Sequence, residues 1–132
     1  GDTQAMSCSE ECTPDGFPTQ SPQRVIRFND WIATVAFFAK PDGSCDKVPL
    51  NMAGYTDFEA VVFVRQPSEP IAEIEVDTNQ KNDGVLTFKL ARDSDFFAQY
   101  PAATYRWQFS MRSAAGVYKT YIRGTYEVLP NG

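Results

Sequence analysis

Seven short runs of apolar residues, separated by turn-forming residues, follow one another between residues 24 and 129. The clearest run is Phe58–Arg65, where every second residue from Phe58 to Val64 is apolar. A period of two places alternate side chains on one face of a β-strand. Seven runs of this kind, rich in aromatic and β-branched residues, predict an all-β sandwich of about seven antiparallel strands.

The other six predicted strands cover residues 24–28, 31–39, 71–77, 85–90, 103–112 and 117–129. The run 31–39 is also partly apolar on its second face, so we expect it to be covered on both sides. Gly124, inside the last run, predicts a bulge. Ser94 and its acidic neighbours predict the N-cap of a single helical turn over Phe96–Tyr100, which Pro101 ends.

The inward faces of these strands predict the hydrophobic core. Each fully buried Phe, Leu or Val contributes roughly 1.5–3 kcal/mol, so more than a dozen inward candidates suffice for an independent fold. Tyr105 begins the sixth strand, where sandwich domains often carry a tyrosine corner. The predicted core residues are Trp31, Val35, Phe37, Phe58, Val62, Phe88, Tyr105, Trp107, Phe109 and Tyr126.

The first 23 residues differ from the rest of the chain. They are rich in Pro, Ser and Thr and contain acidic but no basic residues. We therefore expect an irregular N-terminal arm over residues 1–23 and a β-sandwich domain over residues 24–132. Composition leaves open whether this arm is an unattached terminus or packs against a neighbour.

Composition also excludes classes of function. The net charge of −5 argues against a nucleic-acid partner, because binding phosphates requires a basic surface. No apolar stretch approaches the roughly 20 residues that span a bilayer, so no membrane partner is expected. The chain has no histidine, the commonest general base and metal ligand. We expect no enzymatic activity, no catalytic residue and no cofactor, and a small-molecule partner is not expected either.

Three cysteines, Cys8, Cys12 and Cys45, carry the remaining candidate chemistry. A disulfide such as Cys12–Cys45 would tie the arm to the domain and leave one thiol over. A structural zinc site needs four ligands, so a carboxylate of Glu10 or Glu11, or a neighbouring subunit, would have to complete three sulfurs. Free thiols are the third alternative, and the sequence does not decide among them.

From Arg24 onward, the order of these segments resembles an immunoglobulin-like domain that recurs in virion proteins of tailed bacteriophages. In that pattern a Gly-hydrophobic-Thr stretch feeds a strand that ends in Arg, as Gly54-Tyr55-Thr56 leads to Arg65 here. The segments that carry the resemblance are Arg24–Phe28, Trp31–Phe38, Pro41–Gly43, Gly54–Arg65, Gly84–Phe88, Phe96–Tyr100, Ala103–Phe109 and Ile122–Val128.

The resemblance implies an immunoglobulin-like sandwich that is a non-enzymatic structural subunit of a phage particle. Its place would be the tail, the baseplate or the fibre-attachment region, with capsid decoration as a close alternative. Its partners would be other virion proteins and copies of itself, and its location the virion. The contacts are expected in Ser7–Pro22, Gln66–Glu69 and Lys81–Asp83.

Two other functions compete with this one. An extracellular carbohydrate-binding sandwich would expose some of Tyr55, Tyr100, Tyr118 and Tyr121 as a coplanar stacking platform. A glycosidase would need two carboxyl groups about 5–10 Å apart in a cleft, and nothing in the sequence places two carboxylates together in that way.

Overall fold

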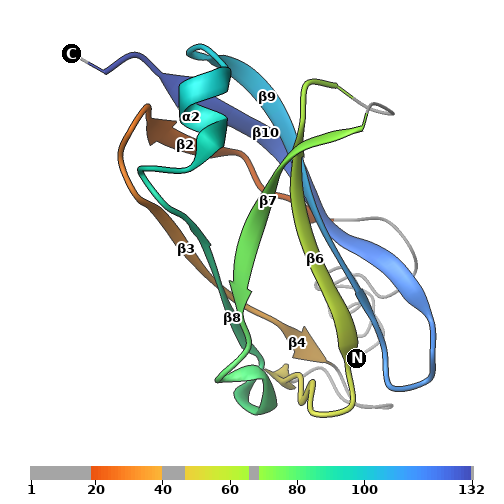
Figure 1. Ribbon diagram of the computed structural model, residues 1–132. Helices are drawn as coiled ribbons and strands as arrows, with labels where there is room; N and C mark the ends of the chain where they lie inside the picture. Colours follow the sequence, from red (N-terminus) through yellow and green to blue (C-terminus); the bar gives the residue numbers. More distant parts are fainter. Residues whose placement is uncertain (1–18, 40–46, 66–68, 132) are drawn as a thin grey trace, which may run out of the picture.

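The computed structural model describes residues 19–39, 47–65 and 69–131, and statements about the structure refer to these ranges (Figure 1). Two helical segments are present there, the 3₁₀ turn η1 (Lys81–Asp83) and the helix α2 (Asp95–Gln99). The strands of this part are β1 (Thr19–Gln20), β2 (Gln23–Ile26), β3 (Trp31–Ala36), β4 (Phe38–Ala39), β5 (Val48–Pro49), β6 (Thr56–Phe63), β7 (Pro70–Asp77), β8 (Val85–Leu90), β9 (Ala103–Arg112) and β10 (Tyr118–Leu129).

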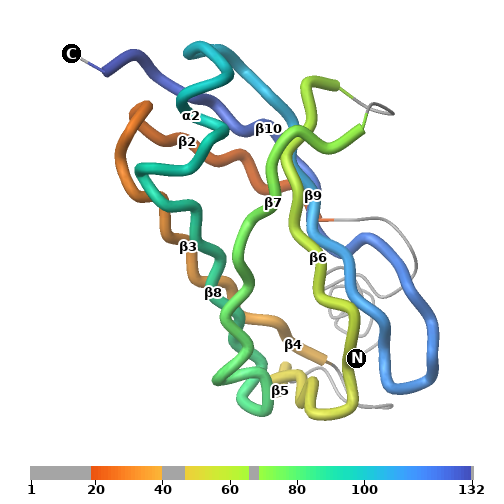
Figure 2. The backbone as a smooth tube through the Cα atoms, in the orientation of Figure 1, coloured from red at the N-terminus to blue at the C-terminus, as the bar shows by residue number. Residues whose placement is uncertain are grey.

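The main sheet follows the order β1-β10-β9-β6-β7-β8-β3, with β2 also paired to β10. Strand β7 joins two layers, because its first part pairs with β6 and its last residues, Glu75 to Asp77, pair with β8. The path curls there, so that β3 and β8 lie opposite β6, β9 and β10 (Figures 1 and 2). The predicted all-β sandwich is confirmed.

Aromatic rings join the two layers across the core. Trp31 of β3 contacts Trp107 of β9 and Tyr126 of β10, with ring centroids 5.9 and 5.0 Å apart. Phe88 of β8 lies 5.0 Å from Phe109 of β9. Seven of the ten predicted core residues are buried, while Val35, Phe37 and Phe58 are half-buried and pack against the same cluster.

Two local predictions near the last two strands agree with the structure. The Tyr105 hydroxyl donates a hydrogen bond to the carbonyl of Pro101 over 2.6 Å, which is the geometry of a tyrosine corner. Ser94 caps α2, because its hydroxyl accepts a hydrogen bond from the backbone N–H of Phe96. Phe96 and Phe97 of this helix are buried in the core.

The prediction for residues 31–39 was wrong in two respects. The strand ends at Ala36, because the Phe37 carbonyl accepts a bond from Leu50 and the chain then pairs with β5. Its second face is open, since Ile32 is 63% exposed. Partly apolar character on both faces therefore did not mean burial on both.

The third predicted strand also ends early, at Phe63 instead of Arg65. Its pairing with β7 is irregular between Val62 and Phe63, so the simple alternation stops there. Val64, predicted to face inward, is exposed, whereas Val61 and Phe63 on the opposite face are buried without belonging to the core cluster.

Gly124 does not mark the bulge of β10, which lies between Thr120 and Ile122. Its role is to admit a neighbouring segment, because a Cβ at Gly124 would lie 2.4 Å from the carbonyl oxygen of Ser21. That carbonyl accepts a hydrogen bond of 2.8 Å from the indole nitrogen of Trp107. The missing side chain thus lets the β1–β2 connection lie on the sheet.

Residues 19–23, predicted to belong to the irregular arm, are part of the sheet. Strands β1 and β2 pair with β10 in parallel, in contrast to the antiparallel pairing expected of all strands. The cause is tertiary, because the free edge of β10 supplies backbone partners that no local pattern reveals. Residues 1–18 lie outside the described ranges.

Candidate functional site

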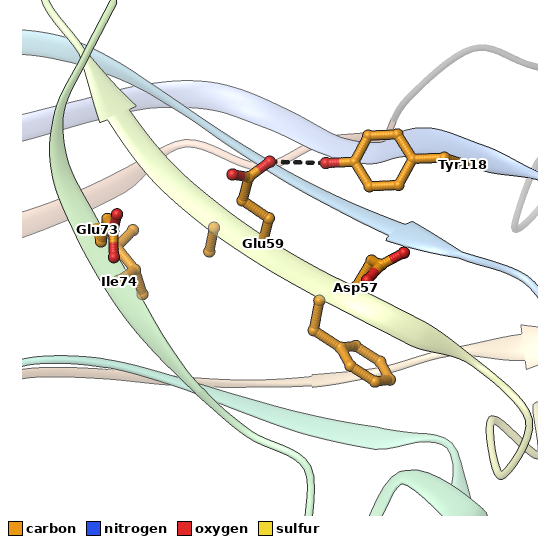
Figure 3. Close-up of a pocket in the computed structure, with 7 residues that line it drawn as sticks. Asp57, Glu59, Glu73, Ile74 and Tyr118 are labelled. Carbon is orange, nitrogen blue, oxygen red and sulfur yellow. Dashed lines mark hydrogen bonds between the residues drawn. The ribbon is translucent and has the colours of Figure 1, made fainter.

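An open groove of about 350 Å³ lies where β6, β7 and the beginning of β10 meet (Figure 3). Its polar side chains are three carboxylates and one phenol: Asp57, Glu59, Glu73 and Tyr118. Figure 3 shows Glu59 directed toward Tyr118, with Glu73 on the β7 side. The groove is therefore an acidic surface feature with one aromatic wall.

Strand β6 supplies two of the acids because they stand two residues apart. Asp57 and Glu59 share the outer face of the strand, while Ala60 on the other face is buried in the core. At Asp57 the backbone is left-handed, with φ of 55°, and the pairing with β9 shifts register between Thr56 and Glu59. Aspartate tolerates this conformation better than most residues, so the sequence allows the irregularity.

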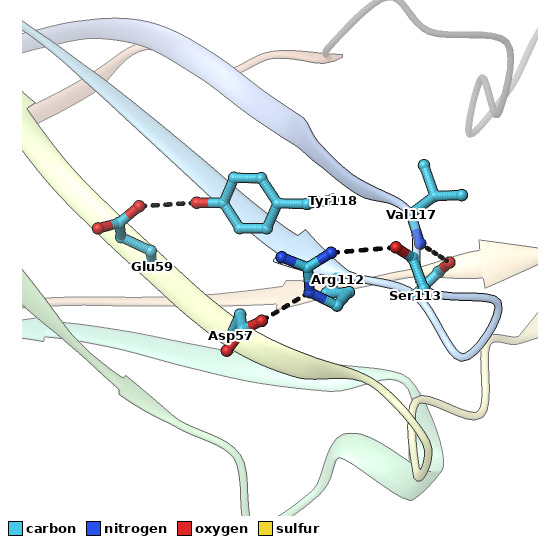
Figure 4. Close-up of polar contacts among 7 residues, drawn as sticks. Asp57, Glu59, Arg112, Ser113, Val117 and Tyr118 are labelled. Atoms are coloured by element: carbon cyan, nitrogen blue, oxygen red, sulfur yellow. Dashed lines mark hydrogen bonds and ion pairs between the residues drawn. The ribbon is translucent and has the colours of Figure 1, made fainter.

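A polar network connects β6 to the β9–β10 hairpin (Figure 4). Arg112 donates from Nε to Asp57 over 2.7 Å and from Nη1 to the Gly116 carbonyl over 3.0 Å. The Tyr118 hydroxyl donates to Glu59 over 2.7 Å. The Arg112 guanidinium also lies 5.4 Å from the centroid of the Tyr118 ring.

The network fixes the orientation of the side chains that line the groove, and it contributes little to the stability of the fold. Asp57 and Arg112 are each about half exposed, and such surface ion pairs contribute about 0–1 kcal/mol. Partial burial and the hydrogen bond to Glu59 raise the pKa of Tyr118 above its usual value. The phenol therefore stays protonated near neutral pH and keeps donating its proton to Glu59.

The carboxylates differ in the partners they hold. Asp57 is paired with Arg112, and Glu59 accepts from Tyr118, whereas Glu73 has no polar partner among the described residues. Such a set attracts a cationic group, for instance a Lys or Arg side chain of another protein.

The sequence did not predict this assembly of carboxylates. Glu73 belongs to the strand predicted at residues 71–77, and its approach to Glu59 depends on the register between β6 and β7. The available signal was the period-two spacing of Asp57 and Glu59, which places two acids on one strand face.

The other predicted contact residues lie elsewhere. Of the four tyrosines proposed as a carbohydrate platform, Tyr118 is exposed, while Tyr55, Tyr100 and Tyr121 are half-buried against the core. These four rings therefore do not form an exposed coplanar trio. In η1, Asn82 and Asp83 are exposed.

Several sequence expectations fall outside the described ranges. Cys8, Cys12 and Cys45 do so, as do most of Ser7–Pro22 and residues 66–68. Within the described ranges, no group of three or more His, Cys, Asp or Glu side chains could hold a metal ion. In that same part of the chain, no helix is long and apolar enough to span a membrane.

Comparison with known proteins gives remote structural likenesses. No family model matches the chain, and no curated protein matches it. The ZIG-8 IG1 homodimer structure is 11% identical, covers 98% of this chain and 97% of its own, and has a TM-score of 0.40. The ZIG-8–RIG-5 IG1–IG1 heterodimer structure is 11% identical, covers 96% of this chain and 98% of its own, and has a TM-score of 0.40. The murine CRIg structure is 10% identical, covers 84% of this chain and 92% of its own, and has a TM-score of 0.36. TM-scores this low carry no argument about function.

Proposed function

We propose that the chain is a non-enzymatic assembly subunit of a tailed-bacteriophage virion, acting through protein–protein contacts in the tail, baseplate or fibre-attachment region, or as capsid decoration. The order of segments from Arg24 onward supports this proposal. A second observation supports the proposal. The stretch Gly54–Ala60 belongs to that resemblance, and it also supplies Asp57 and Glu59 to the groove.

The groove has the chemistry of a contact surface. It is open, it presents an exposed Tyr118, and Asp57 and Glu59 are held in place by hydrogen bonds to β9 and β10. Tyrosine is enriched at protein interfaces, and a cluster of one charge sign directs a partner of the opposite sign. The partner surface would therefore present Lys or Arg side chains to Glu59 and Glu73.

Immunogold labelling tests the virion assignment. Particles of the phage whose genome encodes the chain would be treated with antibody against the purified protein and imaged by negative-stain microscopy. We expect label at one repeated position on the particle. Particles without label at any position would refute the assignment.

Substitution in the groove tests the contact surface. Glu59→Gln combined with Glu73→Gln removes two charges and keeps the side-chain shapes, so we expect a loss of at least about tenfold in infectious titre when this variant complements a phage that lacks the gene. Glu75→Gln on the same β7 strand, exposed and outside the groove, is the matched control. Equal titres for the two variants would argue against the groove.

A further inference from the structure

The free edge of strand β3 is the other unusual surface of the molecule. Among the described residues, β3 pairs only with β8, so it ends the sheet on that side (Figure 1). Its six residues, Trp31 to Ala36, contain no charge and no proline. Charged residues and prolines commonly protect the edge strands of natural proteins, because unpaired backbone groups otherwise recruit another strand.

The register shows which backbone groups face outward. The N–H of Phe37 donates to the carbonyl of Gly84, and this pair continues the β3–β8 register. Hydrogen-bonded pairs alternate along an antiparallel ladder, so Val35 and Ala33 also bond to β8. The N–H and C=O groups of the intervening residues, Ile32, Thr34 and Ala36, therefore point away from the sheet.

Exposed apolar side chains occur on β3 and on the chain segment that leads into it. Ile26, Phe28 and Ile32, three of the seven exposed large hydrophobics in the described ranges, lie within seven residues of each other in the sequence. Ile32 has the largest exposed fraction of these, 63%. The opposite edge of the sheet differs, because Arg24 of β2 forms an ion pair with Glu127 of β10.

We propose that β3 pairs antiparallel with β3 of a second copy of this chain, about a two-fold axis at Thr34. Thr34 then faces its own copy, and Ile32 of each chain faces Ala36 of the other. These three pairs use every outward group of the segment, with two hydrogen bonds per pair. This proposal rests on the contact function above and names one of its partners.

A second copy fits the edge better than the chain's own first 18 residues. That segment has Pro14 and Pro18, which cannot donate to a ladder, and four acidic residues without a basic one. Strand β3 is instead complementary to itself, because the uncharged edge lets two chains of net charge −5 approach without placing like charges opposite each other.

Sedimentation of the purified full chain over a concentration series tests the pairing. We expect a monomer–dimer equilibrium for the wild-type protein. Thr34→Pro removes an outward N–H without removing a bond to β8, so it is expected to weaken dimerisation at least about tenfold. Ile32→Lys is expected to do the same, while Val117→Lys, an exposed substitution in the β9–β10 hairpin, is the control.

Amide hydrogen exchange by NMR locates the contact. The amides of Ile32, Thr34 and Ala36 should gain protection as protein concentration rises, whereas Ala33 and Val35 should be protected throughout. A wild-type chain that stays monomeric, or a dimer without this alternating protection, would overturn the pairing. Labelled virions together with a monomeric chain would refute the pairing alone, and a dimer with unlabelled virions would refute the virion assignment alone.

Discussion

At the scale of single residues, two buried tyrosines show how hydrogen bonding decides the contribution of a hydroxyl. Tyr105 donates its proton to the Pro101 carbonyl, whereas the Tyr126 hydroxyl is buried without a hydrogen-bond partner among the described residues. Burial raises the pKa of Tyr126, so its unpartnered hydroxyl stays protonated. An unpartnered buried hydroxyl costs free energy, while a bonded one contributes to stability.

The substitution Tyr126→Phe is therefore expected to leave the free energy of unfolding unchanged or to raise it by about 1 kcal/mol. Tyr105→Phe removes a comparable hydroxyl that is hydrogen-bonded, and it is expected to lower that free energy by about 1 kcal/mol. Urea unfolding followed by tryptophan fluorescence measures both. A larger loss for Tyr126→Phe than for Tyr105→Phe would contradict the assigned hydrogen bonding.

The same scale explains which residues could be recognised in the sequence. Tyr105 and Ser94 act on backbone groups two to four residues away, so their roles are visible in local spacing. Gly124 acts on Ser21, about a hundred residues earlier, and its role was misread as a bulge. A contact between distant segments leaves no local signal.

At the scale of elements, Gly124 controls how the β1–β2 connection lies on β10. Gly124→Ala would place a methyl group against the Ser21 backbone, which cannot move as a flexible side chain can. We expect a loss of about 1–3 kcal/mol in the free energy of unfolding. We also expect a shifted Trp107 emission, because the indole nitrogen bonds to Ser21.

Gly116→Ala is the comparison for that variant. No atom lies within 4 Å of a Cβ at Gly116, and its cost comes only from the positive φ of 87°. It should leave the Trp107 emission unchanged. An emission shift of equal size in both variants would contradict the close approach of Ser21.

Elements were predicted best where one face is apolar and the other polar. Strands β7, β8 and β9 agree with the alternation, with Leu86, Phe88 and Leu90 buried as expected. Strand β3 was misjudged, because apolar residues on its second face are exposed at a sheet edge. Strand β1 is too short to show a period. Strand β2 was predicted at residues 24–28, but the parallel pairing of β1 and β2 with β10, about a hundred residues later, was not.

At the scale of the whole molecule, the rings of Trp31, Trp107 and Tyr126 hold the two layers together. Trp31→Ala would leave a cavity between the layers, and such substitutions cost about 3–5 kcal/mol. That is a large share of the roughly 5–15 kcal/mol by which domains are stable. Urea unfolding measures this loss.

Ile32→Ala is the control, because Ile32 is the next residue and faces outward. At concentrations where the chain is monomeric, we expect it to change the free energy of unfolding by no more than about 0.5 kcal/mol. A large loss in this variant would show that the outer face of β3 is covered, as the sequence had predicted.

By itself, the amino-acid sequence determined the fold class, most strands, the helix cap and the tyrosine corner. These features arise from side-chain alternation and from hydrogen bonds between close neighbours in the chain. Only the tertiary structure decided which strand lies at an edge, why Gly124 has no side chain, and that Glu73 meets Glu59 in one groove. These depend on strand order and register, which are set by packing between segments far apart in sequence.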